Sequence, residues 1–140
     1  MKHGIEGVAE IVLWVRDMDL ALHFYGGLLG LEVISPPELP IKFLKAAEGE
    51  HGIPDMIVLV VHPDGLAFPR AKGERVLHHI AFRVAASEYD GLRRSLEADG
   101  NEIRSGVHPV LKGVRTFYVD DPDGNEVEII SPDADAARRG

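Results

Sequence analysis

The chain has 140 residues, of which 45% are hydrophobic and 27% charged, with a formal net charge of −8. These values are typical of one globular domain with a substantial core, and the acidic balance argues against nucleic acid or an anionic membrane as a partner. The absence of cysteine excludes disulfides and leaves histidine and carboxylate side chains as the strong metal ligands. Because no segment is apolar over a membrane-spanning length and no secretion signal opens the chain, we expect a cytoplasmic protein.

The first half of the chain predicts a strand, a helix and three shorter strands. The strand is expected near residues 8–16, and the helix behind Asp17, where Leu20, Phe24 and Leu28 fall at helical spacing. Short strands follow near 31–34, 41–46 and 56–61, separated by segments containing proline and glycine. Residues 62–76 contain further prolines and glycines and are expected to link this half to the next.

The second half repeats this order. A strand is expected over residues 79–84, and a helix after it with Ser87 as N-cap, because Asp90 follows at capping-box spacing. Tyr89, Leu92 and Leu96 form its expected buried stripe. Further strands are predicted near 102–105, 115–120 and 125–130, the last two joined by the hairpin turn Asp121-Pro122-Asp123-Gly124-Asn125. Residues 131–140 are expected to form a frayed tail.

One fixed offset relates the two halves. Glu10 and His79 open similar strands 69 residues apart, and the same offset carries the segment 58–64 onto 127–133, which matches Leu59 with Glu128. A chain that repeats itself in this way is two copies of one supersecondary unit. We therefore predict an α+β fold within a single domain, residues 1–140. It has two βαβββ modules, at about 8–64 and 77–133, which form an eight-stranded mixed-sheet cup with a helix outside each half.

Strand alternation predicts which side chains share the face away from the helices. Glu10, Trp14, His79, Arg83 and Glu128 all fall on that face, because alternate residues of a strand point to the same side. A carboxylate in an apolar strand such as that of Glu128 is costly to bury without a partner. The face thus collects potential metal ligands, together with an aromatic wall in Trp14 and a cationic anchor in Arg83. His78 is expected to point to the opposite face, and Arg115 is a further candidate for the anchor.

These segments resemble a known family. The resemblance covers about residues 8–132 and rests on the opening strand followed by Asp17 and Phe24-Tyr25, on His79–Val84, and on Phe117–Ile130 with its Asp-Pro-Asp-Gly-Asn turn. This pattern is similar to the vicinal oxygen chelate superfamily, which includes glyoxalase I, bleomycin resistance proteins and extradiol dioxygenases. The resemblance implies a cup around a divalent metal, commonly in a homodimer, on which a small substrate is chelated through two neighbouring oxygens.

Residue by residue, the resemblance implies that Glu10, His79 and Glu128 ligate the metal. The fourth ligand position falls at Leu59, which has no donor atom and would instead line the substrate pocket with Trp14 and Arg83. The set departs from the two-histidine triad of the iron dioxygenases because Glu10 stands where they have histidine. One imidazole and two carboxylates suit Zn²⁺, Ni²⁺, Mn²⁺ or Fe²⁺.

The expected function is a glyoxalase-like metal-dependent lyase or isomerase acting on a small molecule with vicinal oxygens. In this hypothesis Glu128 or Glu10 is the base that moves a proton. An extradiol-type dioxygenase is the first alternative, supported by Tyr118, since a tyrosine at a similar place binds the substrate oxygen in such relatives. A metal-free drug-binding protein of the bleomycin-resistance type is the second alternative, for which the net charge and Trp14 are suitable.

Overall fold

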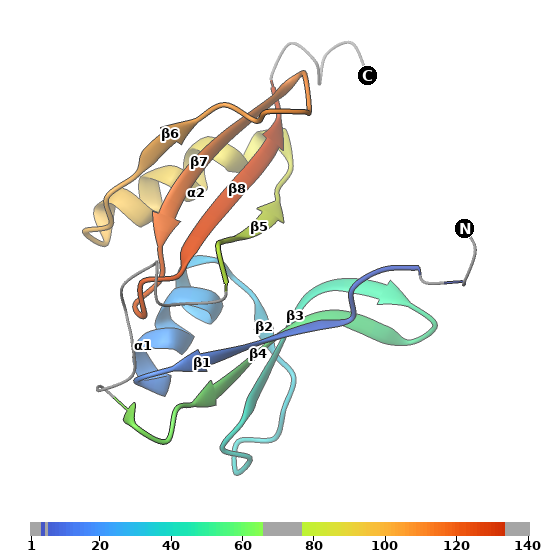
Figure 1. Cartoon of the computed structure of the whole chain (residues 1–140), viewed down its shortest axis with the longest axis vertical. Coiled ribbons are helices and arrows are strands. Elements are labelled where there is room, and N and C mark those ends of the chain that lie inside the picture. Colours follow the sequence, from blue (N-terminus) through green and yellow to red (C-terminus); the bar gives the residue numbers. More distant parts are fainter. Residues whose placement is uncertain (1–3, 5, 66–76, 134–140) are drawn as a thin grey trace. The chain divides into compact units, whose positions relative to one another are not determined.

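The structure, a computed structural model, describes residues 4, 6–65 and 77–133 (Figure 1). The chain divides into two compact units, residues 1–68 and 69–140. Most of the expected linker lies outside the described residues, as does most of the expected tail. Within the described part of the chain, no helix has the length and apolar character needed to cross a membrane.

The first unit contains one mixed four-stranded sheet. In chain order its elements are β1 (Glu10–Val15), α1 (Met18–Leu22), the π-helical turn η1 (His23–Leu28), β2 (Glu32–Val33), β3 (Lys42–Glu50) and β4 (Ile53–Val61). The strands lie in the order β1-β4-β3-β2, with β1 parallel to β4 and the other pairs antiparallel. The expected N-cap is confirmed, because the Asp17 carboxylate accepts the backbone N–H of Leu20 at 3.1 Å.

The second unit has the same plan. Its elements are β5 (Ile80–Arg83), α2 (Ala86–Ala98), β6 (Arg104–Gly106), β7 (Val114–Asp120) and β8 (Glu126–Pro132), in the sheet order β5-β8-β7-β6. Here β5 is parallel to β8, and the other pairs are antiparallel. The predicted α+β fold of two βαβββ modules is therefore confirmed.

Helix α2 covers one face of the second sheet. Tyr89 packs edge-on against Phe117 of β7, with ring centroids 5.1 Å apart, and both side chains are buried. Arg115 lies on this face as well, with its guanidinium 4.1 Å from the Tyr89 ring centroid and 3.3 Å from Asp90. Arg115 is thus bound to the helix, and the prediction of a substrate anchor there is wrong. The capping prediction is also wrong, because the helix begins at Ala86 and Asp90 contacts Arg115 instead.

The face of the second sheet that lies away from α2 is called here its helix-free face. Strand alternation and register place on it the side chains that alternate with the buried apolar ones. They are Ala81 and Arg83 of β5, Glu126, Glu128 and Ile130 of β8, Thr116, Tyr118 and Asp120 of β7, and Arg104 and Gly106 of β6.

The first sheet shows that Leu59 does not lie on the face predicted for it. Leu59 pairs with Leu13, and both side chains are buried. They share their face with Leu44, which contacts the helical segment, since a Cβ added at Gly26 would lie 3.8 Å from Leu44 Cδ2. Val58 instead pairs with Val12, on the helix-free face of this sheet. The strand register is therefore shifted by one residue from the predicted register, which turns Leu59 toward the helix.

Candidate metal centre

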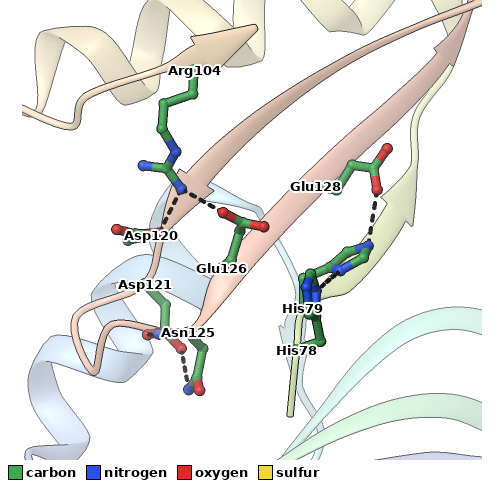
Figure 2. Close-up of polar contacts among 8 residues, drawn as sticks. All are labelled: His78, His79, Arg104, Asp120, Asp121, Asn125, Glu126 and Glu128. Atoms are coloured by element: carbon green, nitrogen blue, oxygen red, sulfur yellow. Dashed lines mark hydrogen bonds and ion pairs between the residues drawn. The ribbon is translucent and has the colours of Figure 1, made fainter. Parts of the chain in front are cut away.

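A histidine and a buried glutamate meet on the helix-free face of the second sheet. His79, immediately before β5, places Nε2 3.2 Å from Oε1 of Glu128 on β8 (Figure 2). The pair forms because β5 runs parallel to β8 with Ala81 beside Glu128, so the segment just before β5 lies next to Glu128. This confirms the expected proximity of His79 and Glu128.

The Glu128 carboxylate is enclosed by protein. The residue is only 3% exposed, and its Oε2 accepts a hydrogen bond of 2.6 Å from the Thr116 hydroxyl on β7. An ionised carboxylate at such a position is unfavourable without a nearby positive charge. Thr116 contributes a hydrogen bond but no charge, and Oε1 faces the imidazole.

Tyr118 lies directly opposite Glu128 in the β7–β8 hairpin. Its ring centroid is 6.2 Å from that of His79, and the ring lies over Gly106, where any side chain would overlap it. Burial, followed by the negative charges of Glu128 and Glu126, raises the pKa of Tyr118 above its ordinary value of 10.0. The phenol is therefore protonated at neutral pH and can donate a hydrogen bond.

The hairpin turn fixes this arrangement. Asp121 Oδ1 accepts the backbone N–H groups of Asp123 and Asn125 at 2.9 and 2.8 Å. Its Oδ2 accepts the Asn125 side-chain amide at 2.9 Å (Figure 2). Such aspartate-centred bonds are typical of tight turns. They hold the two strands in the register that sets Tyr118 against Glu128, so the most specific motif in the sequence positions the candidate site.

His78 lies beside His79 and does not point away from it. The two Nδ1 atoms are 2.8 Å apart, with ring centroids at 5.0 Å. The prediction of opposite faces is wrong because both residues precede β5, and strand alternation does not apply to an irregular segment. Among the described residues, His78, His79 and Glu126 also offer donor atoms that all lie within 4.8 Å of one another.

Glu126 is already bound to a cation within the protein. Arg104 Nη2 lies 3.1 Å from Glu126 Oε2 and 2.7 Å from Asp120 Oδ1, which links β6, β7 and β8 (Figure 2). Glu128, two residues along β8, has no guanidinium contact among the interactions of the described residues. The two carboxylates of β8 therefore differ in what compensates their charge.

The residues present suit a divalent transition metal. The side-chain donors are imidazole nitrogen and carboxylate oxygen, the combination that Zn²⁺, Mn²⁺ and Fe²⁺ accept. Ligands at about 2.0–2.2 Å from a common ion lie about 3–3.5 Å from each other, and the His79–Glu128 separation of 3.2 Å is of this size. A cation there would compensate the buried charge of Glu128.

The other predicted site residues lie on the expected faces of their own sheets. Glu10 is exposed at the start of β1 and pairs with Met56. Trp14 follows on the same face, 52% exposed, and packs edge-on against His62 with centroids 4.8 Å apart. Arg83 is exposed at the end of β5. The roles of Glu10, Trp14 and Arg83 stay predictions.

Sequence reasoning missed Thr116 and Arg104 and misplaced His78. The position of Thr116 could have been predicted from the hairpin, because a tight turn after residue 120 fixes which residues of the next strand lie opposite Thr116. No comparable signal marks Arg104, whose role depends on the pairing of β6 with β7.

Comparisons with known proteins identify a family and several structures of similar fold. The family model described as Glyoxalase/Bleomycin resistance protein/Dioxygenase superfamily matches residues 7–129. A glyoxalase/dioxygenase from Nostoc punctiforme superposes with a TM-score of 0.72 at 24% identity, covering 94% of each chain. A mutant of the fosfomycin resistance protein FosX from Listeria monocytogenes, in complex with Mn(II) and 1S,2S-dihydroxypropylphosphonic acid, gives 0.65 at 23% identity and 94% of each chain. TnmS3, an antibiotic binding protein from Streptomyces sp. CB03234, gives 0.60 at 20% identity, covering 92% of this chain and 98% of that one.

Proposed function

The chain belongs to the Glyoxalase/Bleomycin resistance protein/Dioxygenase superfamily, and from that membership we propose that it is a metal-dependent lyase or isomerase of glyoxalase type. Its substrate would be a small molecule with two neighbouring oxygens. The observation that carries this proposal is the contact of His79 Nε2 with the buried Glu128 carboxylate, 3.2 Å away. A protein that only binds a drug has no need to bring an imidazole and a buried carboxylate together.

His79 and Glu128 would hold the ion, which lowers the cost of developing negative charge on a substrate oxygen. Thr116 keeps one Glu128 oxygen engaged, so that carboxylate is better suited to ligation than to moving a proton. Tyr118, protonated and adjacent, can donate a hydrogen bond to a substrate oxygen.

Glu10 is proposed either as the third ligand or as the base that moves the proton. It is exposed on the helix-free face of the first sheet, with Val12 and Trp14. Glu10→Gln separates the two roles. A ligand role predicts weaker metal binding, whereas a base role predicts unchanged metal affinity and a large loss of turnover.

A binding protein is the second candidate, and one observation favours it. Val12 and Trp14 are 53% and 52% exposed on one face of β1, an apolar surface suited to an aromatic ligand. Such a protein would bind its ligand equally well with and without a divalent ion.

The experiment that tests the proposal is a metal-dependent activity screen. Protein stripped with a chelator and reloaded with Zn²⁺, Ni²⁺, Mn²⁺ or Fe²⁺ is assayed against 2-oxoaldehyde–thiol adducts, 2-hydroxy and 2-oxo acid derivatives, epoxides and catechols. We expect turnover that requires the ion and is lost in His79→Ala. Consumption of oxygen with a catechol would replace the lyase assignment by a dioxygenase. Ligand binding independent of metal, without turnover, would contradict the enzyme proposal.

A further inference from the structure

His79 has two ring nitrogens, and each faces a different partner. Nε2 faces Glu128 Oε1 at 3.2 Å, and Nδ1 faces His78 Nδ1 at 2.8 Å. The ring orientation is therefore set from both sides. A metal-ligating histidine generally uses its second nitrogen to hydrogen-bond a group that fixes its orientation, and His78 occupies that place here.

We propose that His78 is a positioning residue, which holds the His79 ring with Nε2 toward Glu128 and so raises the metal affinity of the site. The inference rests on the proposed function, because it assigns His79 and Glu128 to the same ion. It adds to that function a hydrogen bond between adjacent imidazoles, made possible by the irregular segment before β5.

The pairing constrains the protons on both rings. Nitrogen atoms 2.8 Å apart require that one of them donates. Nε2 of His79 faces a carboxylate oxygen, which accepts, so without metal this nitrogen carries the proton and His78 Nδ1 donates to His79 Nδ1 in a neutral pair. A ligating Nε2 needs its lone pair, which moves the proton of a neutral His79 to Nδ1 and makes His78 Nδ1 the acceptor. His78 can fill both roles because a neutral imidazole carries its proton on either nitrogen.

A direct ligand role for His78, together with His79 and Glu126, is the competing interpretation, since their donor atoms lie within 4.8 Å of one another. Two observations oppose it. Glu126 is already bound by Arg104. If His79 coordinated through the nitrogen that faces His78, its other nitrogen, which faces Glu128, would hold no ion there. The buried carboxylate would then have no cation beside it.

The test compares His78→Asn with His78→Leu in the full chain. The asparagine side chain can place an amide oxygen near the position of Nδ1 and accept the same hydrogen bond, whereas leucine cannot. By titration of Zn²⁺ into chelator-treated protein, we expect affinity to fall about 10- to 100-fold in His78→Leu and to stay within about threefold of wild type in His78→Asn. His78 is exposed, so the melting temperature of both metal-free variants should match that of wild type.

Nitrogen-15 NMR of the zinc-loaded wild-type protein tests the same arrangement of metal and protons on the two histidines without any substitution. We expect a metal-bound Nε2 and a protonated Nδ1 on His79, with both nitrogens of His78 free of metal. Metal coordination by His78, or equal Zn²⁺ affinity in wild type and His78→Leu, overturns the positioning role and leaves the proposed function standing. Failure of the wild-type protein to bind Zn²⁺, Mn²⁺, Ni²⁺ or Fe²⁺ overturns both.

Discussion

The Thr116 hydroxyl donates a hydrogen bond of 2.6 Å to Oε2 of Glu128, across the β7–β8 hairpin. This contact leaves Oε1 directed at His79. The orientation of the one buried glutamate among the described residues is thus set by a neighbouring strand, and metal binding should depend on a residue that touches no metal.

Thr116→Val tests that dependence. The substitution conserves shape but removes the donor, which leaves a buried carboxylate oxygen unsatisfied, so we expect the free energy of unfolding to fall by about 1–3 kcal/mol. Metal affinity should fall about 10- to 100-fold. Thr116→Ser, which keeps the hydroxyl, is the matched control for calorimetric titration and denaturant unfolding. Wild-type metal affinity in Thr116→Val would show that the hydroxyl does not orient the ligand.

Tyr118→Phe separates binding from turnover. The ring can stay over Gly106, and only the hydroxyl is lost. A hydrogen bond to a charged group contributes about 1.5–3 kcal/mol, so kcat/KM should fall about 10- to 100-fold while metal affinity stays unchanged. Steady-state kinetics and Zn²⁺ titration of the same preparation check this. An unchanged kcat/KM would assign Tyr118 to packing alone.

The pH dependence of stability should report on Tyr89. Burial is the main cause that raises its pKa above the ordinary 10.0, and the nearby Arg115 opposes the shift. A group with a raised folded pKa contributes stability that is fully present below the unfolded value and lost as pH rises through the folded one. Above pH 10.0, wild type should therefore lose more stability than Tyr89→Phe. Parallel unfolding curves for the two proteins across the alkaline range would contradict the shift.

Leu59→Glu measures the register of β4 directly. Leu59 is fully buried against the helix side of the first sheet, so a carboxyl group there should lower the free energy of unfolding by at least about 3 kcal/mol. Leu59→Met, which conserves volume, should cost less than about 1.5 kcal/mol. A stable Leu59→Glu protein with tighter metal binding would instead support the register that the sequence repeat predicted.

The Leu59 error shows where a repeat stops being informative. Ile11 pairs with Ile57, and its equivalent Ile80 pairs with Val127, so β4 and β8 match at an offset one residue longer than β1 and β5. The strands before them differ. β3 carries register irregularities and ends in a two-residue turn at residues 51–52, whereas β7 pairs with β8 in continuous register and leads into a five-residue turn, residues 121–125. Sequence similarity in apolar strands does not detect such a single-residue shift.

The predictable part of the site followed from strand alternation and the hairpin turn. Alternation placed Glu128 on the face that the repeat also assigned to His79, whereas Tyr118 was suggested by the resemblance, from its place across the hairpin from Glu128. Contacts outside regular strands were not predictable, because the irregular segment before β5 has no periodicity from which the direction of a side chain could be predicted. The contact between His78 and His79 belongs to this class. The Arg104 network lies within strands, but it depends on the pairing of β6 with β7, which a seven-residue segment separates in the sequence.

The central claim is that the chain binds a divalent metal through Glu128, and one comparison tests it most directly. Zn²⁺ is titrated into chelator-treated wild type, Glu128→Gln and Glu126→Gln, which remove one carboxylate each from the same face of β8. The account predicts one tightly bound ion per chain in wild type, loss of that binding in Glu128→Gln, and affinity within about threefold of wild type in Glu126→Gln, whose carboxylate is held by Arg104. Equal binding in wild type and Glu128→Gln, or no binding in any of the three, would contradict it.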